Sequence, residues 1–128
     1  MAEQRCPCGA GLPLAECCGP LHDGTRVAST AEQLMRARFA AFAVGNPGYL
    51  LATWHVTTRP ADLHLDNDLR WTALDVVATT GGMLLSAEGT VELRAHYRRN
   101  GTAGVQHERS RFLREHGRWW YLDGVSLS

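Results

Sequence analysis

The sequence contains no lysine, so arginine supplies all 13 of its basic side chains, and these balance 13 acidic ones to a net charge of zero. This balance removes the overall electrostatic attraction that favours binding to nucleic acid or to an acidic membrane. No apolar run approaches the roughly 18 residues of a membrane-spanning helix, and the mean hydropathy is −0.22. The first residues also lack the apolar stretch of a secretory signal. We therefore expect a cytoplasmic protein with no membrane contact.

Several patterns of catalytic chemistry are absent as well. The sequence has no phosphate-binding glycine loop, no HExxH stretch and no Ser-His-Asp order. Its 128 residues are enough for one compact domain with a real core and a small appendage. The cysteines and a pocket within the fold are therefore the candidate functional features.

No cysteine occurs after residue 18, and all four lie close together as Cys6, Cys8, Cys17 and Cys18. Disulfides between them would close only a very short loop, and a Cys17–Cys18 bridge would be strained. Two pairs of thiols across a Gly-rich turn suit a tetrahedral metal ion better, because zinc accepts four thiolates at about 2.3 Å. Four thiolates also hold iron, so iron is the alternative metal, and inert or redox thiols are the alternative use. His22 is a possible substitute ligand.

The spacing of these cysteines resembles a known small zinc module. Cys6-Pro7-Cys8-Gly9-Ala10-Gly11, followed after eight intervening residues by Cys17-Cys18-Gly19, is similar to the SEC-C motif. That motif has the pattern Cys-x-Cys, eight residues, then Cys followed by His or Cys. The resemblance implies one zinc ion held by all four cysteines and a contact with a protein or ribosomal partner.

The middle of the chain has helical periodicity and the C-terminal half has strand periodicity. Ser29-Thr30-Ala31-Glu32 reads as a capping box, with the Ser29 side chain as the cap, and the helix that follows extends to about Val44. Asn46-Pro47 begins a second short helix through Trp54. Alternating residues predict strands over 71–79, 90–98, 105–114 and 118–125, with Asn100-Gly101 and His116-Gly117 as turns.

Helices followed by an antiparallel meander indicate an α+β fold with the helices packed on one face of the sheet. We expect two parts, a metal-binding knuckle over residues 1–24 and an α+β domain over residues 25–128. In the larger part, the order of helices followed by strands resembles that of the cone of nuclear transport factor 2 (NTF2), a curved sheet that wraps helices around a pocket.

The whole chain is similar to the YchJ-like family of small bacterial proteins, which joins a SEC-C knuckle to such a cone. The matching segments are Leu34-Met35-Arg36-Ala37-Arg38-Phe39, Tyr49, Thr53-Trp54-His55, Thr58-Arg59-Pro60, Gly89-Thr90-Val91-Glu92, residues 107–112, Gly117-Arg118-Trp119, Tyr121 and Asp123-Gly124. The resemblance implies an architecture and a metal site but no particular reaction. The cone fold itself includes isomerases, dehydratases and epoxide hydrolases.

Strand parity predicts which side chains enter the cone, because alternate residues point to opposite faces. Phe112 is the large apolar residue of its strand face, so Glu108 and Ser110 should point inward with it. Glu92 lies opposite the apolar face of its own strand and would reach the interior only through a bulge. We expect the pocket to be lined by Trp54, His55, Arg59, Glu92, Glu108, Ser110 and Tyr121.

Arginines gather on the predicted strands despite the neutral overall charge. Arg94, Arg98, Arg109 and Arg111 could form a basic stripe on the outer face of the sheet. Such a stripe would be able to contact RNA or a ribosome.

Three functions therefore compete. The first is a metal-binding protein whose zinc site and cone form a protein-interaction or ligand-binding module. The second is a small-molecule enzyme of the isomerase, dehydratase or hydrolase type, with Glu108, Glu92 or His55 as acid or base. The third is RNA or ribosome contact through the arginine stripe. We favour the first, with an unknown protein or small ligand as the partner.

Overall fold

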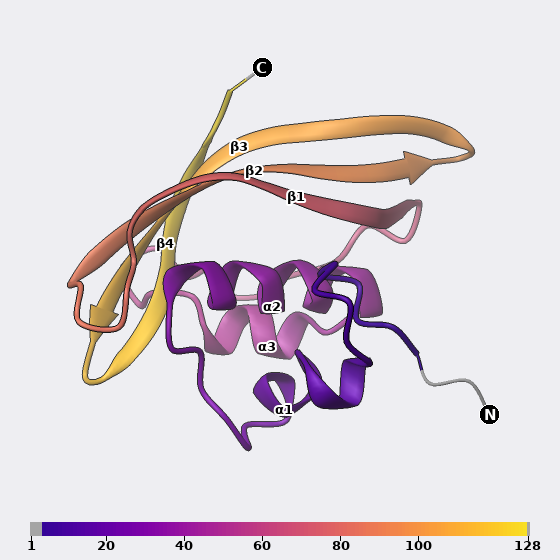
Figure 1. Cartoon of the computed structure of the whole chain (residues 1–128). Helices are drawn as coiled ribbons and strands as arrows, with labels where there is room; N and C mark the ends of the chain where they lie inside the picture. Colours follow the sequence, from indigo (N-terminus) through magenta and orange to yellow (C-terminus); the bar gives the residue numbers. More distant parts are fainter. Residues whose placement is uncertain (1–3, 128) are drawn as a thin grey trace.

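The computed structural model describes residues 4–127 and has an α+β architecture. Its elements, in chain order, are the 3-10 helix η1 (Leu14–Glu16), the helices α1 (Gly19–His22), α2 (Ala31–Val44) and α3 (Pro47–Ala52), and the strands β1 (Leu69–Gly81), β2 (Glu88–Arg99), β3 (Thr102–Glu115) and β4 (Arg118–Ser126). The four strands form one antiparallel sheet in the order β1-β2-β3-β4. Figure 1 shows this curved sheet on one side of α2 and the N-terminal segment with α1 on the other.

The predicted strands are confirmed, each slightly longer than the alternation of residues indicated. Asn100 and Gly101 both have positive φ, 52° and 84°, as the tight turn between β2 and β3 requires. Register shifts at two places in the β1–β2 pair and at one place in the β3–β4 pair add local bends. The sheet therefore curls around the helices as a cone.

The main core lies between the concave face of the sheet and α2. Val91 and Leu93 of β2 and Phe112 of β3 are buried there against Leu34 and Phe39 of α2. Val91 pairs with Ser110 and Leu93 pairs with Glu108, so these partners share the concave face. The inward direction of Glu108 and Ser110 follows from strand parity as expected.

The N-terminus of α2 differs from the prediction by one residue. Thr30, not Ser29, is the capping residue, and its Oγ1 accepts a hydrogen bond from the Gln33 backbone N–H at 3.1 Å. Gln33 Oε1 in turn accepts from the Ser29 backbone N–H at 2.6 Å. Glu32 therefore takes no part in the cap and instead pairs with Arg36, one turn later, at 3.1 Å.

The second helix is also shorter than expected, because α3 ends at Ala52. The chain beyond it runs beside β4, where the His55 N–H donates to the Tyr121 carbonyl at 2.7 Å and the Tyr121 N–H donates to the Thr53 carbonyl at 2.9 Å. Trp54 is thus held against the last strand of the sheet. Across residues 4–127, no helix is long and apolar enough to cross a membrane.

Candidate metal centre and interior pocket

The four cysteines are brought together by a tight loop and a short helical turn. The Cys6 N–H donates to the Leu12 carbonyl at 2.9 Å and closes the loop that carries Cys6 and Cys8. Gly9 and Gly11 lie within it at φ values of 84° and 86°, a region that favours glycine. Cys17 and Cys18 follow η1 directly.

The four sulfur atoms all lie within 4.8 Å of one another. Cys8 Sγ is 3.6 Å from Cys17 Sγ, and Cys17 Sγ is 4.0 Å from Cys18 Sγ. Four sulfurs at about 2.3 Å from a tetrahedral ion would be about 3.8 Å apart, so this spacing matches a thiolate-bound metal. None of the four is in a disulfide. The chemistry of the donor set therefore fits a metal site.

The protonation of the cluster indicates that a cation is needed to ionise all four thiols. Hydrogen bonding from the Cys18 thiol lowers the pKa of Cys8 to about 5. Burial and the neighbouring sulfurs raise the pKa of Cys17 to about 12, and the neighbouring sulfurs and burial also raise that of Cys18. One thiolate is stable while its neighbours keep their protons, because adjacent negative charges repel. A bound metal ion displaces these protons.

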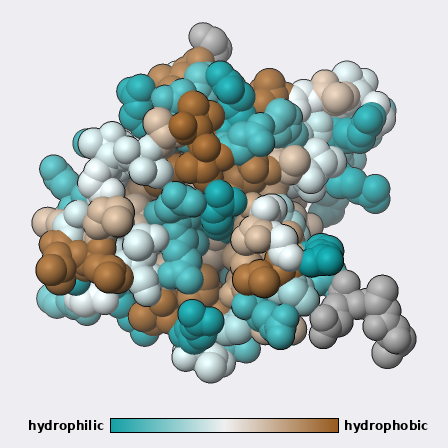
Figure 2. All heavy atoms as spheres, in the orientation of Figure 1, coloured by the Kyte–Doolittle hydropathy of each residue, from teal (hydrophilic) through white to brown (hydrophobic). Residues whose placement is uncertain are grey.

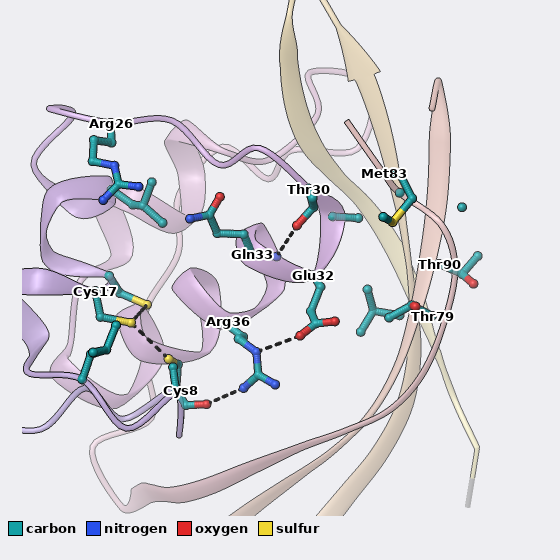
Figure 3. Close-up of a pocket in the computed structure, with 18 of the residues that line it drawn as sticks. Cys8, Cys17, Arg26, Thr30, Glu32, Gln33, Arg36, Thr79, Met83 and Thr90 are labelled. Carbon is teal, nitrogen blue, oxygen red and sulfur yellow. Dashed lines mark hydrogen bonds and ion pairs between the residues drawn. The ribbon is translucent and has the colours of Figure 1, made fainter. Parts of the chain in front are cut away.

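The cysteine segment is attached to the outer side of α2. Cys6, Cys8, Cys18 and Leu21 form a small buried cluster with Ala37 and Ala40 of the helix. Arg36 Nη1 donates to the Cys8 carbonyl at 2.8 Å, while its Nε holds Glu32 (Figure 3). His22 does not join the sulfurs, because its Nε2 donates to the Ala37 carbonyl at 2.8 Å.

A groove of about 530 Å³ opens beside the cysteines, between their segment and the turn from β1 to β2. Figure 3 shows Cys8 and Cys17 on one side, Thr79, Met83 and Thr90 on the other, and Arg36 between them. The metal site thus forms one wall of a surface depression.

A second cavity of about 280 Å³ lies inside the cone, between α2 and the concave face of the sheet. Its lining includes Trp54, Glu108, Ser110 and Tyr121, four of the seven residues expected there. Gln106 and Ser110 donate hydrogen bonds to the two carboxylate oxygens of Glu108, at 2.8 and 3.4 Å. Burial and the charge of Glu108 raise the pKa of Tyr121.

The other three expected residues lie outside this cavity, and their assignment is corrected. Glu92 points to the convex face, where its Oε2 accepts from His107 Nε2 at 2.6 Å, because β2 runs without a bulge past that position. His55 is buried but hydrogen-bonds Glu115 through Nε2, at 2.9 Å. Arg59 is exposed in the loop after α3.

Arg38 also lines this cavity, although it was not among the expected lining residues. Its side chain is only 3% exposed, and its Nη1 donates to the Leu50 carbonyl and to Thr53 Oγ1, both at 2.8 Å. The guanidinium carbon lies 4.2 Å from the centre of the Tyr121 ring and 5.0 Å from that of Trp54. Burial lowers the pKa of Arg38 to about 10, which keeps it charged at neutral pH. Arg38 lies four residues after Leu34 and four before Phe42, on the apolar face of the helix, and this position was the available signal.

The predicted arginine stripe does lie on one face of the sheet, but acidic side chains interrupt it. Arg111 forms a bidentate pair with Asp123, at 2.7 and 2.6 Å. Arg109 pairs in register with Glu92, and Arg94 with Asp75. The convex face is therefore charged and mixed in sign.

Comparison with known proteins shows the family of this chain. The family described as "YchJ, middle NTF2-like domain" matches residues 30–124. A UPF0225 protein of Streptomyces coelicolor is 50% identical over 99% of both chains, and one of Corynebacterium glutamicum is 50% identical over 94% of this chain and 96% of its own.

Solved structures show the same fold. A SEC-C motif containing protein from Rhodopseudomonas palustris is 32% identical, with a TM-score of 0.84 over 98% of this chain and 100% of the other. A SEC-C motif containing protein from Psychrobacter arcticus is 28% identical, with a TM-score of 0.77 over 94% of this chain and 81% of the other. The chain therefore belongs to the UPF0225 family of YchJ-like proteins, with a SEC-C motif before an NTF2-like domain.

Proposed function

We propose that this protein is a zinc-binding interaction module, in which the metal fixes the N-terminal segment on α2. The observation that carries the proposal is the convergence of the Cys6, Cys8, Cys17 and Cys18 sulfurs within 4.8 Å. Four thiolates bind zinc in a closed structural site that leaves no open position for a substrate. The metal therefore has a structural role, and the surface that it stabilises carries the function.

Zinc is the proposed metal. Iron is the alternative, and metal analysis distinguishes the two. Both ions accept four thiolates, but zinc has no redox chemistry and holds a short loop without other support. Cysteines that bind a metal ion as thiolates must stay reduced, so the proposed site suits a reducing compartment such as the cytoplasm.

Metal analysis is the direct test of this site. Native mass spectrometry and elemental analysis of protein purified without added metal should give one zinc ion per chain. The variant Cys8→Ser should lose most of it, because Cys8 is fully buried at the centre of the cluster. Protein with four titratable thiols and no zinc or iron would refute the metal site, and stoichiometric iron would refute the choice of zinc.

The proposed docking surface for a protein partner is the groove beside the cysteines together with the turn from β1 to β2. Met83, Leu84 and Leu85 in that turn are 65%, 62% and 90% exposed, and Figure 2 shows an apolar patch over the turn, at the left of this face. Exposed apolar side chains in one place are typical of protein contacts. The partner expected here presents apolar side chains to the turn.

A photo-crosslinking amino acid at Leu85 tests this surface in cells, with the same group at Val105 as the matched control. Val105 is also exposed, at 50%, but lies on the convex face. Discrete crosslinked proteins from position 85, absent from position 105 and lost with Cys8→Ser, would support metal-dependent docking. Equal crosslinking from both positions would refute the docking surface while leaving the metal assignment to its own test.

The cone pocket supports a second candidate function, the binding of a small molecule. A cavity of about 280 Å³ with a buried cation and a carboxylate in its lining is the observation that favours it. Glu92 and His55, two of the three expected acid–base groups, do not line this cavity. We therefore propose binding there rather than catalysis, and we propose no RNA contact through the interrupted arginine stripe.

A further inference from the structure

The guanidinium of Arg38 has an unused edge in the cone pocket. Its Nη1 makes both of the hydrogen bonds that anchor it to α3 and the residue after it. Within the described part of the chain, Nε and Nη2 make no hydrogen bond and Arg38 makes no ion pair, although the residue lines the cavity. A buried cation with free donors is a binding site for an anionic oxygen, because carboxylates accept two parallel N–H bonds from guanidinium.

Glu108 supplies an acceptor in the same cavity. Gln106 and Ser110 fix its carboxylate from its own strand, so it is oriented without a positive partner. Arg38 and Glu108 attract each other across the cavity but form no ion pair in the described structure. A ligand with an anionic group and a hydrogen-bond donor can satisfy both residues at once.

The remaining walls are aromatic and limit the size of the ligand. The ring centres of Phe39 and Phe42 are each 6.1 Å from that of Trp71, and Trp54 contributes a further ring. Trp54 Nε1 is buried and has no hydrogen-bond partner among residues 4–127. A volume of about 280 Å³ is at the small end of ligand pockets, which suits one ring rather than a nucleotide.

We propose that the cone pocket binds a small aromatic carboxylic acid that carries a hydrogen-bond donor on its ring. The carboxylate contacts the free edge of Arg38, the ring packs among the aromatic walls, and the donor contacts Glu108. The inference rests on the second candidate function, small-molecule binding in the cone. It is independent of the zinc proposal, because this site is separate from the metal centre.

The test uses the whole metal-loaded protein and three probe compounds: 4-hydroxybenzoate, benzoate and phenol. Binding is measured by the shifts of the tryptophan indole N–H signals in NMR, with Trp54 and Trp71 assigned through Trp→Phe variants. We expect 4-hydroxybenzoate to bind best, since it alone has both groups. Phenol should bind weakest, because it lacks the carboxylate that Arg38 recognises.

Two matched variants identify the contacts. Glu108→Gln should weaken 4-hydroxybenzoate about tenfold, which corresponds to about 1.4 kcal/mol, and should change benzoate binding much less. Glu92→Gln removes the same charge from the convex face of the neighbouring strand and should change neither. Arg38→Gln should abolish the preference for carboxylates over phenol. If that variant does not fold, the comparison of Glu108→Gln with Glu92→Gln still tests the proposal.

The proposal is overturned by any of three results. One is that none of the probes shifts the Trp54 or Trp71 signals at about 10 mM, which is weaker than any specific site should be. Another is that phenol binds as tightly as 4-hydroxybenzoate. The third is that Glu108→Gln and Glu92→Gln weaken binding equally.

Discussion

Removing the metal should release the N-terminal segment and leave the cone folded. The perturbation is either a zinc chelator or the variant Cys8→Ser, which replaces a fully buried thiol of the cluster. The segment is held to the rest of the protein by few contacts. Besides the packing of the cysteines on α2, these include the burial of Leu21, the His22 ring 4.7 Å from that of Tyr49, and the bonds from Arg36 to the Cys8 carbonyl and from His22 to the Ala37 carbonyl.

The energies of these contacts are too small to order the segment without a metal ion. Burying one leucine contributes about 2 kcal/mol, and each of the two hydrogen bonds and the ring contact about 1 kcal/mol, which gives about 5 kcal/mol together. Fixing the backbone of residues 6–22 costs roughly 17 kcal/mol, at about 1 kcal/mol for each residue. The difference, on the order of 10 kcal/mol, is the scale of free energy that a structural zinc site supplies, about 10–16 kcal/mol.

Hydrogen–deuterium exchange read by mass spectrometry separates the two parts directly. Peptides from residues 4–24 should lose protection on chelation, while peptides from β2 and β3 should keep it, because their core residues contact α2 rather than the cysteines. Zinc added back should restore protection in the natural protein but not in Cys8→Ser. Asp23→Asn, which changes an exposed side chain at the end of α1, is the control and should behave as the natural protein.

Two results would contradict this reasoning. If residues 4–24 stay protected without metal, contacts with α2 alone are sufficient and the magnitudes above are wrong. If the strands lose protection in the same transition, the proposed division between residues 1–24 and 25–128 is wrong.

Three smaller predictions follow from individual contacts. Gly89→Ala should lower the free energy of unfolding by about 2 kcal/mol in denaturant titrations, because the new methyl group would lie 2.5 Å from Gly82 Cα. His22→Ala should keep one metal ion per chain in native mass spectrometry and cost about 1 kcal/mol of stability. The pair with Arg111 lowers the pKa of Asp123, so this pair stabilises the fold above the ordinary aspartate pKa and is lost as pH falls through the lowered one. In NMR titrations, Arg111→Gln should therefore raise the pKa of Asp123.

Each of these has a contrary outcome, and the first also has a control variant. Gly48→Ala is the control and should not change the stability, because its methyl group would meet only Asn46 Oδ1 at 3.5 Å. If both alanines destabilise the protein equally, the close contact at Gly89 is not the cause. Loss of metal in His22→Ala would make the histidine a ligand after all. An unchanged pKa of Asp123 in the arginine variant would show that the pair is not formed in solution.

The fold was predictable because its main signals are local in sequence. Alternation with a period of two marks the strands, and Asn100-Gly101 marks a turn whose φ values only a few residue types adopt readily. The inward direction of Glu108 followed from Phe112 on the same strand, since parity is a local property. The gathering of the cysteines was predictable for the same reason, as all four lie within a stretch of 13 residues.

The errors arose where a partner distant in sequence decides the position of a side chain. His55 lies outside the cavity because it hydrogen-bonds Glu115, which is 60 residues further along the chain. Glu92 is kept on the convex face because the irregularities of its pairing lie in β1, and no local pattern shows where a partner strand bulges. The cap of α2 moved by one residue because Gln33 competes with Glu32 for the same role.

Helix α2 explains how a chain this short carries two separate sites. Successive helical residues are about 100° apart around the axis, so Arg36 and Arg38 point in nearly opposite directions. Arg36, with Ala40, faces the cysteine segment, where the small alanine lets the loop approach closely. Arg38, with Phe39, faces the cone pocket and the sheet. Because packing against the sheet holds the pocket side of the helix, loss of the metal should disturb the groove beside the cysteines and leave the pocket intact.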